Sequence, residues 1–205
     1  MMVRITVCFK IVPDYEEIPV PDWQKGQIPD TTFCKKMYGC FDEAALETGL
    51  RLKDALTAAG REVCMTAVTV GTGQAALLTG LYAAGYDRVV CITEELQRPA
   101  SCPGPEGTEA RQMSHSGPEG TEARQMSHSG PEAIALQLAA YLRQEPADLI
   151  LTGRQVGGWD SGTVPAYLAA ALSLPWLPEV VSLAPEAMPP VSEQAERPTF
   201  VADCE

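Results

Sequence analysis

The sequence is short of the residues that most protein metal sites need. It contains only two histidines, and none of its seven cysteines belongs to a C-x-x-C pair. Structural zinc sites and iron–sulfur clusters are usually held by several such ligands at short spacing. We therefore expect no metal centre in this chain.

Basic residues and long apolar runs are also scarce. The chain has 15 lysines and arginines against 27 aspartates and glutamates, which gives a net charge of −12. This charge disfavours nucleic acids and anionic membrane surfaces as partners, because both require a basic protein face. No apolar run reaches the length of about 20 residues that a transmembrane helix requires, so we expect no direct membrane insertion.

The cysteines and the amino terminus suit a reducing compartment. Cys8, Cys64 and Cys91 lie in or beside apolar, strand-like runs, where cysteine usually serves as a small buried hydrophobe. Residues 1–14 lack the long apolar stretch and the small-residue cleavage site of a signal peptide. These features predict a cytoplasmic protein.

Strand-like and helix-like segments alternate along the chain. The predicted strands, rich in β-branched residues, span 3–9, 62–70, 88–92, 148–152 and 179–183. The predicted helices span 41–60, with Asp42 as its cap, 73–85, 131–144 and 163–171. This alternation predicts an α/β fold, a Rossmann-like parallel sheet with helices on both faces. Ligands of such sheets bind beyond the carboxyl ends of the strands.

One segment interrupts this alternation. The sequence GPEGTEARQMSHS occupies residues 104–116 and is repeated without change at 117–129. The repeat resembles a recent duplication, because repeats that build an architecture diverge and number three or more. His115 and His128 would allow a paired-histidine metal site, but a passive loop insertion is the interpretation that we favour.

Two glycine-rich turns could hold a ligand, and the first is VGTGQAA. Gly71, Gly73 and Ala76 fit the G-x-G-x-x-[GA] spacing of a dinucleotide site, and Glu94 stands where a ribose-binding carboxylate is expected. Short glycine patterns are common, however, and this one follows the second predicted strand, not the first. The alternative is a tight turn that lets the following helix pack against the sheet.

The second turn, GRQVGGWDSGTVP, carries more potential ligand groups. Its glycines expose backbone N–H groups, Ser161 and Thr163 add hydroxyls, and the following helix adds the positive end of its dipole. Together these groups could hold a phosphate. Asp160 opposes an anion unless its carboxylate accepts backbone N–H groups, and Arg154 could act as a counter-charge. No Walker lysine or G-x-S-x-G elbow is present, so the turn is suited to binding and not to covalent chemistry.

Three segments together resemble a known family. ITVCFKIVPD, GCFDEAALETGLRLKDA and DLILTGRQVGGWDSGTVPAYLAAALSLP occur in this order between residues 5 and 175. They resemble the β subunits of electron transfer flavoproteins, including the FixA-like subunits. The resemblance runs from about Val3 to Leu183 and implies a Rossmann-like fold related to the adenine nucleotide alpha hydrolases.

The resemblance implies an electron carrier and not a catalyst of bond making. Such a β subunit pairs with an α subunit that holds most of the redox FAD, and a dehydrogenase supplies the electrons. The β subunit itself holds AMP or, in bifurcating members, a second FAD. The implied nucleotide contacts are Cys8, Gly39, Cys40, Phe41, Asp42, Val70, Gly153, Arg154, Gln155, Gly158, Asp160, Ser161, Gly162, Thr163 and Val164.

The sequence departs from the family pattern at a few positions. Gly39-Cys40 replaces an asparagine-proline pair, and Gly158 replaces an aspartate. We expect a nucleotide-binding domain over residues 1–185, with an insertion at 104–129, followed by an apparently truncated tail at 186–205. A stand-alone NAD(P)-binding oxidoreductase and an adenine-nucleotide-binding regulatory domain of the stress-protein type are the alternatives.

Overall fold

The structure is a computed structural model that describes residues 2–17, 31–93, 100–101, 130–155, 160–186 and 200–204. Its centre is a five-stranded sheet in the order β6-β5-β4-β1-β7. The parallel strands are β1 (Val3–Cys8), β4 (Val63–Val70), β5 (Arg88–Ile92) and β7 (Leu149–Thr152). The short edge strand β6 (Ala100–Ser101) runs antiparallel to β5.

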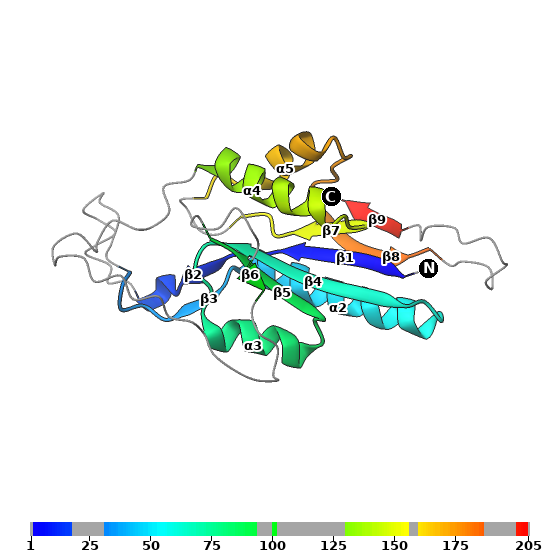
Figure 1. Ribbon diagram of the computed structural model, residues 1–205, viewed down its shortest axis with the longest axis horizontal. Helices are drawn as coiled ribbons and strands as arrows, with labels where there is room; N and C mark the ends of the chain where they lie inside the picture. The colour runs from blue at the N-terminus through cyan, green and yellow to red at the C-terminus, as the bar shows by residue number, and fades with distance from the viewer. Residues whose placement is uncertain are drawn as a thin grey trace.

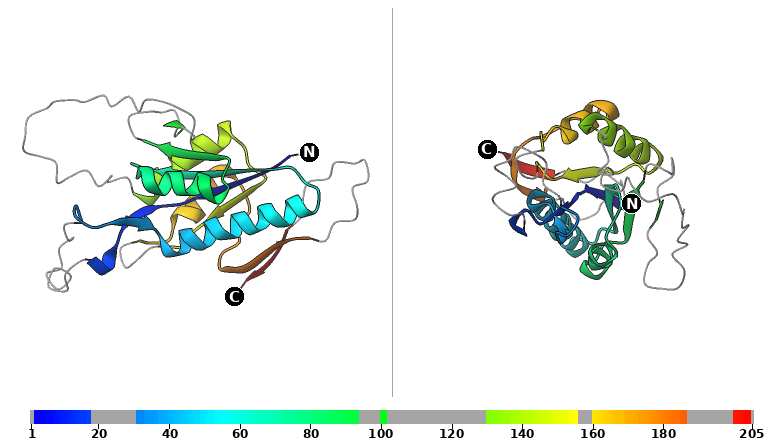
Figure 2. Two further views of the ribbon diagram at one scale, coloured as in Figure 1. Left: turned by 90° about the horizontal axis from the view of Figure 1, so that it is seen from below. Right: turned by 90° about the vertical axis from the view of Figure 1, so that its left-hand side faces the viewer.

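Helices cover both faces of this sheet (Figure 1). Helices α2 (Cys40–Ala58) and α3 (Ala75–Ala84) lie on one face, and α4 (Pro131–Gln144) and α5 (Val164–Leu172) lie on the other. The end-on view in Figure 2 shows the same two helical layers. The predicted Rossmann-like α/β fold is therefore confirmed.

The strands are apolar on both faces because both faces are buried. Val7 and Met65 point into the core with α2 and α3, whereas Val68 and Val90 point into the core with α4 and α5. Helix α3 ends where predicted, since Gly85 takes φ 117° in the left-handed region that favours glycine.

A small hairpin leaves the end of β1. Strand β2 (Ile11–Pro13) pairs with β3 (Lys36–Tyr38), and a single 3₁₀ turn, η1 (Tyr15–Glu17), follows β2. Tyr38 packs edge-on against Phe9 of the core, with ring centroids 5.8 Å apart. This hairpin leads the chain from β1 into the first turn of α2.

The last predicted strand has a different partner from the one expected. Residues 179–183 were expected to extend the parallel sheet, but β8 (Val180–Pro185) pairs antiparallel with β9 (Phe200–Cys204). Leu183 and Phe200 pack on the core beside α2, and the opposite side of the hairpin is exposed. A strand propensity identifies β8 but does not encode its partner, which lies beyond the predicted domain boundary at residue 185.

No helix in the described part of the chain combines the length and the apolar character that crossing a bilayer requires. The duplicated segment at 104–129, with both histidines, lies outside the described residues.

Candidate functional site

The candidate site lies where β1, β4 and β7 end. Cys8 closes β1 and is in register with Thr152, the last residue of β7. The loop after β7 therefore meets the chain that leaves β1, and both lie beside the start of α2 (Figure 2, left). Val70 ends β4 at the same edge of the sheet. The topology thus brings together the segments that the sequence predicts to contact a nucleotide.

The first turn of α2 differs from the prediction at Asp42. The cap is the backbone of Gly39, without a side-chain hydrogen bond, so the prediction that Asp42 caps the helix is wrong. Asp42 is the third helical residue, and only 3% of it is exposed. The two residues before it, Cys40 and Phe41, are exposed at the helix start.

The Asp42 carboxylate is bound by the two chain segments that leave the sheet. The backbone N–H groups of Lys10 and Gly153 donate hydrogen bonds to it. Its Oδ2 atom is buried and has no hydrogen-bond partner among the described residues. Burial raises the Asp42 pKa from its ordinary 3.8 to about 6, although the Lys10 charge and these N–H groups act in the opposite direction.

Gly153 is a glycine because the backbone directly after β7 passes over the start of α2. A Cβ atom built on Gly153 would lie 2.3 Å from Asp42 Oδ1 and 2.7 Å from the Asp42 backbone nitrogen. These distances are far below van der Waals contact, so no side chain fits here. The glycine lets the loop and the helix approach each other and fixes the position of Asp42.

Lys10 supplies the positive charge of the site. Its ammonium group pairs with the carboxylate of Asp160, which is in the loop after β7. Lys10 is not among the contacts predicted from the sequence. The available signal was a lone lysine directly beyond the carboxyl end of an apolar strand, in the segment VCFKIVPD.

Asp160 also organises the turn that precedes α5. Its Oδ1 accepts a hydrogen bond from the Gly162 N–H group at 2.9 Å, so the carboxylate is compensated by both a backbone donor and Lys10. Gly162 takes φ +64°, and a Cβ atom there would lie 3.2 Å from the Arg154 carbonyl oxygen. The electrostatic objection to Asp160 in an anion site is thereby reduced.

The start of α5 is suited to an anion. Thr163 is the cap residue but makes no side-chain hydrogen bond to the helix, and its hydroxyl is instead 2.7 Å from that of Ser161. Val164 is the first helical residue. The Thr163 side chain therefore does not cap the first N–H groups of α5, and Pro165 at the second position has no N–H group, while the helix dipole makes this end positive.

The other predicted nucleotide contacts differ in their surroundings. Cys8 is buried, and burial, followed by the nearby Asp42 charge, raises its pKa to about 12, so it is a neutral wall and not a nucleophile. The Arg154 side chain is 61% exposed, and its guanidinium lies 3.7 Å from the Glu179 carboxylate, so its charge is already offset. Gln155 lies over Gly162, and Gly158 falls outside the described residues.

The first glycine turn has a packing role. Gly71 follows β4 at φ +107°, and a Cβ atom at Gly73 would lie 2.5 Å from Leu78 and 2.8 Å from Cys91 Sγ. Gly73 therefore allows α3 to pack against β5, which supports the tight-turn interpretation. Glu94, the acidic residue of the proposed dinucleotide motif, is outside the described residues.

The comparison with protein families agrees with part of the predicted resemblance. Residues 108–204 match the model of the electron transfer flavoprotein domain. The match is just under half of the chain and includes β7, the glycine turn, α5 and the β8–β9 hairpin. It supports the electron transfer flavoprotein family as a whole. No curated protein matches the chain.

Proposed function

We propose that this chain is the β-type subunit of an electron transfer flavoprotein and binds AMP, or the adenine nucleotide part of a second FAD. The main support for this proposal is that Asp42, Lys10 and Asp160 lie close together at the carboxyl edge of the sheet. Asp160 belongs to the segment that matches the flavoprotein domain, whereas Lys10 and Asp42 precede that segment. The site is therefore shared between both halves of the chain.

The turn from Asp160 to Val164 would hold the nucleotide phosphate. Gly162 has no side chain to block the turn, and the start of α5 adds the positive end of the helix dipole. Lys10 lies at this turn through its pair with Asp160, so it would reduce the repulsion between that carboxylate and the phosphate. We assign this role to Lys10 and not to Arg154, whose guanidinium lies beside Glu179.

Asp42 would hold a donor group of the same nucleotide. Its buried Oδ2 has no partner among the described residues, and a ribose hydroxyl or an amine could donate to it. Cys8 and Val70 would form apolar walls beside it. The donor and acceptor groups of the edge therefore fit an adenine nucleotide.

A flavin supplies the redox chemistry of such a complex when it is bound. The chain's own residues would bind and orient the nucleotide, and a partner subunit would help to enclose the flavin. Six large apolar side chains after α5 are exposed and could contribute to the contact with such a partner. They are Leu174, Trp176, Leu177, Val180, Val181 and Val201.

The proposal is tested by electron transfer with and without a partner. We expect the purified chain alone to pass no electrons from NADH or an acyl-CoA dehydrogenase to an artificial acceptor. Activity should appear after co-expression with an α-type flavoprotein subunit, and the two subunits should dissociate as salt concentration rises, since the chain is strongly acidic. Steady NADH oxidation by the chain alone would contradict the proposal.

A further inference from the structure

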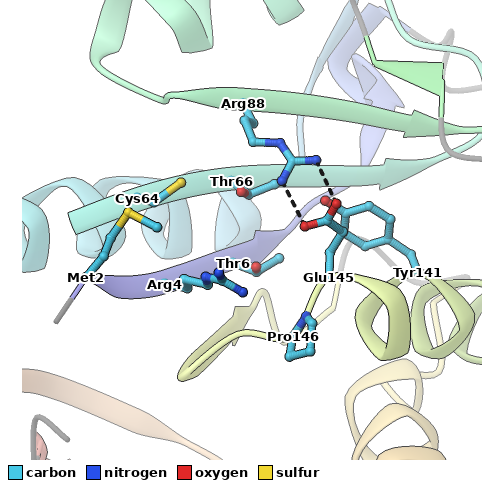
Figure 3. A pocket seen from close by; sticks show the side chains of 9 residues that line it. All are labelled: Met2, Arg4, Thr6, Cys64, Thr66, Arg88, Tyr141, Glu145 and Pro146. Carbon is cyan, nitrogen blue, oxygen red and sulfur yellow. Dashed lines mark hydrogen bonds and ion pairs between the residues drawn. The ribbon is translucent and has the colours of Figure 1, made fainter. Parts of the chain in front are cut away.

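A second polar site lies at the opposite end of the sheet. A cavity of about 110 Å³ opens between the amino ends of β1, β4 and β5 and the end of α4. A single water needs only about 10–15 Å³ of such space. Figure 3 shows that Arg4, Thr6, Thr66, Arg88, Tyr141 and Glu145 surround this cavity.

On the sheet face that packs against α4, strands β1, β4 and β5 change from apolar to polar residues at the same level. Cys8, Val68 and Val90 form an apolar row that packs under α4. The next row on the same face lies two positions closer to the amino end of each strand. It consists of Thr6, Thr66 and Arg88. Three neighbouring strands therefore become polar at the same level, and this is the level of the cavity.

Several polar groups in this cavity lack partners. Thr6, Thr66 and Tyr141 are 4%, 6% and 3% exposed. Within the described ranges, their hydroxyls form no hydrogen bond. None of these hydroxyl oxygens is among the fully buried polar atoms without a partner in the described residues, so they open onto the cavity, where a polar ligand can bind them. Burial raises the Tyr141 pKa, which keeps its hydroxyl protonated as a donor.

The two arginines of the cavity differ in their partners, although the Glu145 charge acts on both. Glu145 accepts from both terminal nitrogens of Arg88, at 3.0 and 3.4 Å, and so neutralises it. The nearby Asp148 carboxylate accepts the Arg4 backbone N–H at 2.9 Å. The Arg4 guanidinium forms no hydrogen bond or ion pair with any described residue, so its donors are available.

We propose that this cavity binds a small oxyanion, a phosphate- or carboxylate-sized group held by the Arg4 guanidinium and the hydroxyls of Thr6, Thr66 and Tyr141. Arginine donates in a planar fork that matches both kinds of group. The proposal does not depend on a nucleotide at the other end of the sheet.

The test is calorimetric titration of the full chain with inorganic phosphate and, separately, with acetate, at constant ionic strength. Each titration is performed on the Gly162→Val background as well as on the unmodified chain, which separates this cavity from the turn before α5. Arg4→Met removes the cation, and Thr66→Val removes one hydroxyl while keeping the side-chain shape. Arg51→Met, on the exposed side of α2, removes an equal charge elsewhere and is the control.

We expect at least one of the two probes to bind, with the same affinity in the Gly162→Val and Arg51→Met variants. Arg4→Met should weaken binding at least about tenfold and Thr66→Val about threefold to tenfold, as expected for lost hydrogen bonds to an anion. Amide NMR shifts should appear around Thr6 and Thr66. Binding that is unchanged in Thr66→Val and Arg4→Met, or lost in a Gly162→Val chain that keeps the circular dichroism spectrum of the unmodified chain, would overturn the proposal, as would no binding of either probe.

Discussion

The candidate sites at the two ends of the sheet are built differently. The site at the carboxyl ends of the strands is formed mainly by loop backbone, whereas the cavity at the amino ends is lined by side chains of the strands. At the carboxyl edge, Gly153 and Gly162 let loops approach helix starts, and the charges of Lys10 and Asp160 are paired. At the amino edge, Thr6 and Arg4 project from regular strands into a cavity. The first site therefore depends on loop geometry, and the second depends on strand register.

The largest expected effect is at the carboxyl edge. Gly153→Ala places a methyl group against Asp42 and should lower the free energy of unfolding by about 2–3 kcal/mol, because the backbone must move. Gly80→Ala is the matched control, since its nearest neighbour would be 3.8 Å away, and should raise stability by about 0.5–1 kcal/mol. Urea denaturation measures both. If Gly153→Ala and Gly80→Ala change the free energy of unfolding equally, the loop after β7 is not in close contact with α2.

The second effect is the pH dependence that Asp42 confers. Its pKa is about 6 in the folded chain and near 3.8 otherwise, so the folded state binds more protons between these values. Stability from this group is therefore present below about pH 4 and lost as pH rises to about 6, by about 2–3 kcal/mol. The difference in unfolding free energy between the unmodified chain and Asp42→Asn should follow this curve. A difference that is constant from pH 4 to 7 would refute it.

A smaller effect is expected for the ion pair between Lys10 and Asp160. Lys10→Met should cost about 1 kcal/mol in urea denaturation at pH 7, because the lysine is partly exposed and its pair is screened by solvent. The same substitution removes a charge that lowers the Asp42 pKa, so the pH curve of the previous experiment should move to higher pH. If the curve moves to lower pH, Lys10 does not act on Asp42.

The smallest effect is at the amino edge. Arg88 and Glu145 are each 44% exposed, so Glu145→Gln should cost less than about 1 kcal/mol. Denaturation at low and high salt should show that this small cost shrinks as salt rises. A cost as large as that of Gly153→Ala would remove the contrast between the two edges.

The sequence predicts the elements better than their partners. Apolar periodicity and Pro131 at the first helical position place α4 at its observed bounds, and the run RVVCI is β5. The pairing of β8 with β9 was missed, because a strand pattern does not identify its neighbour. The starts of α2 and α5 were predicted to lie at the nucleotide site, and in the structure both lie at the carboxyl edge of the sheet.

The groups that hold the site together were harder to predict. Asp42 looks like a helix cap in sequence, but the close approach of Gly153 makes it a buried third residue. Lys10 reaches Asp160 across 150 positions, a contact that only the fold creates. The row of Thr6, Thr66 and Arg88 likewise needs the register of three strands.

The most direct test of the nucleotide site is calorimetric titration of the full chain with AMP and with FAD. We expect one nucleotide per chain and, for Gly162→Val, an affinity at least about tenfold lower, because the phosphate needs close approach to the backbone N–H groups. Gly80→Ala and Arg4→Met should bind like the unmodified chain. Unchanged affinity in Gly162→Val, or no binding of either nucleotide to the unmodified chain, would contradict a nucleotide site at the carboxyl edge.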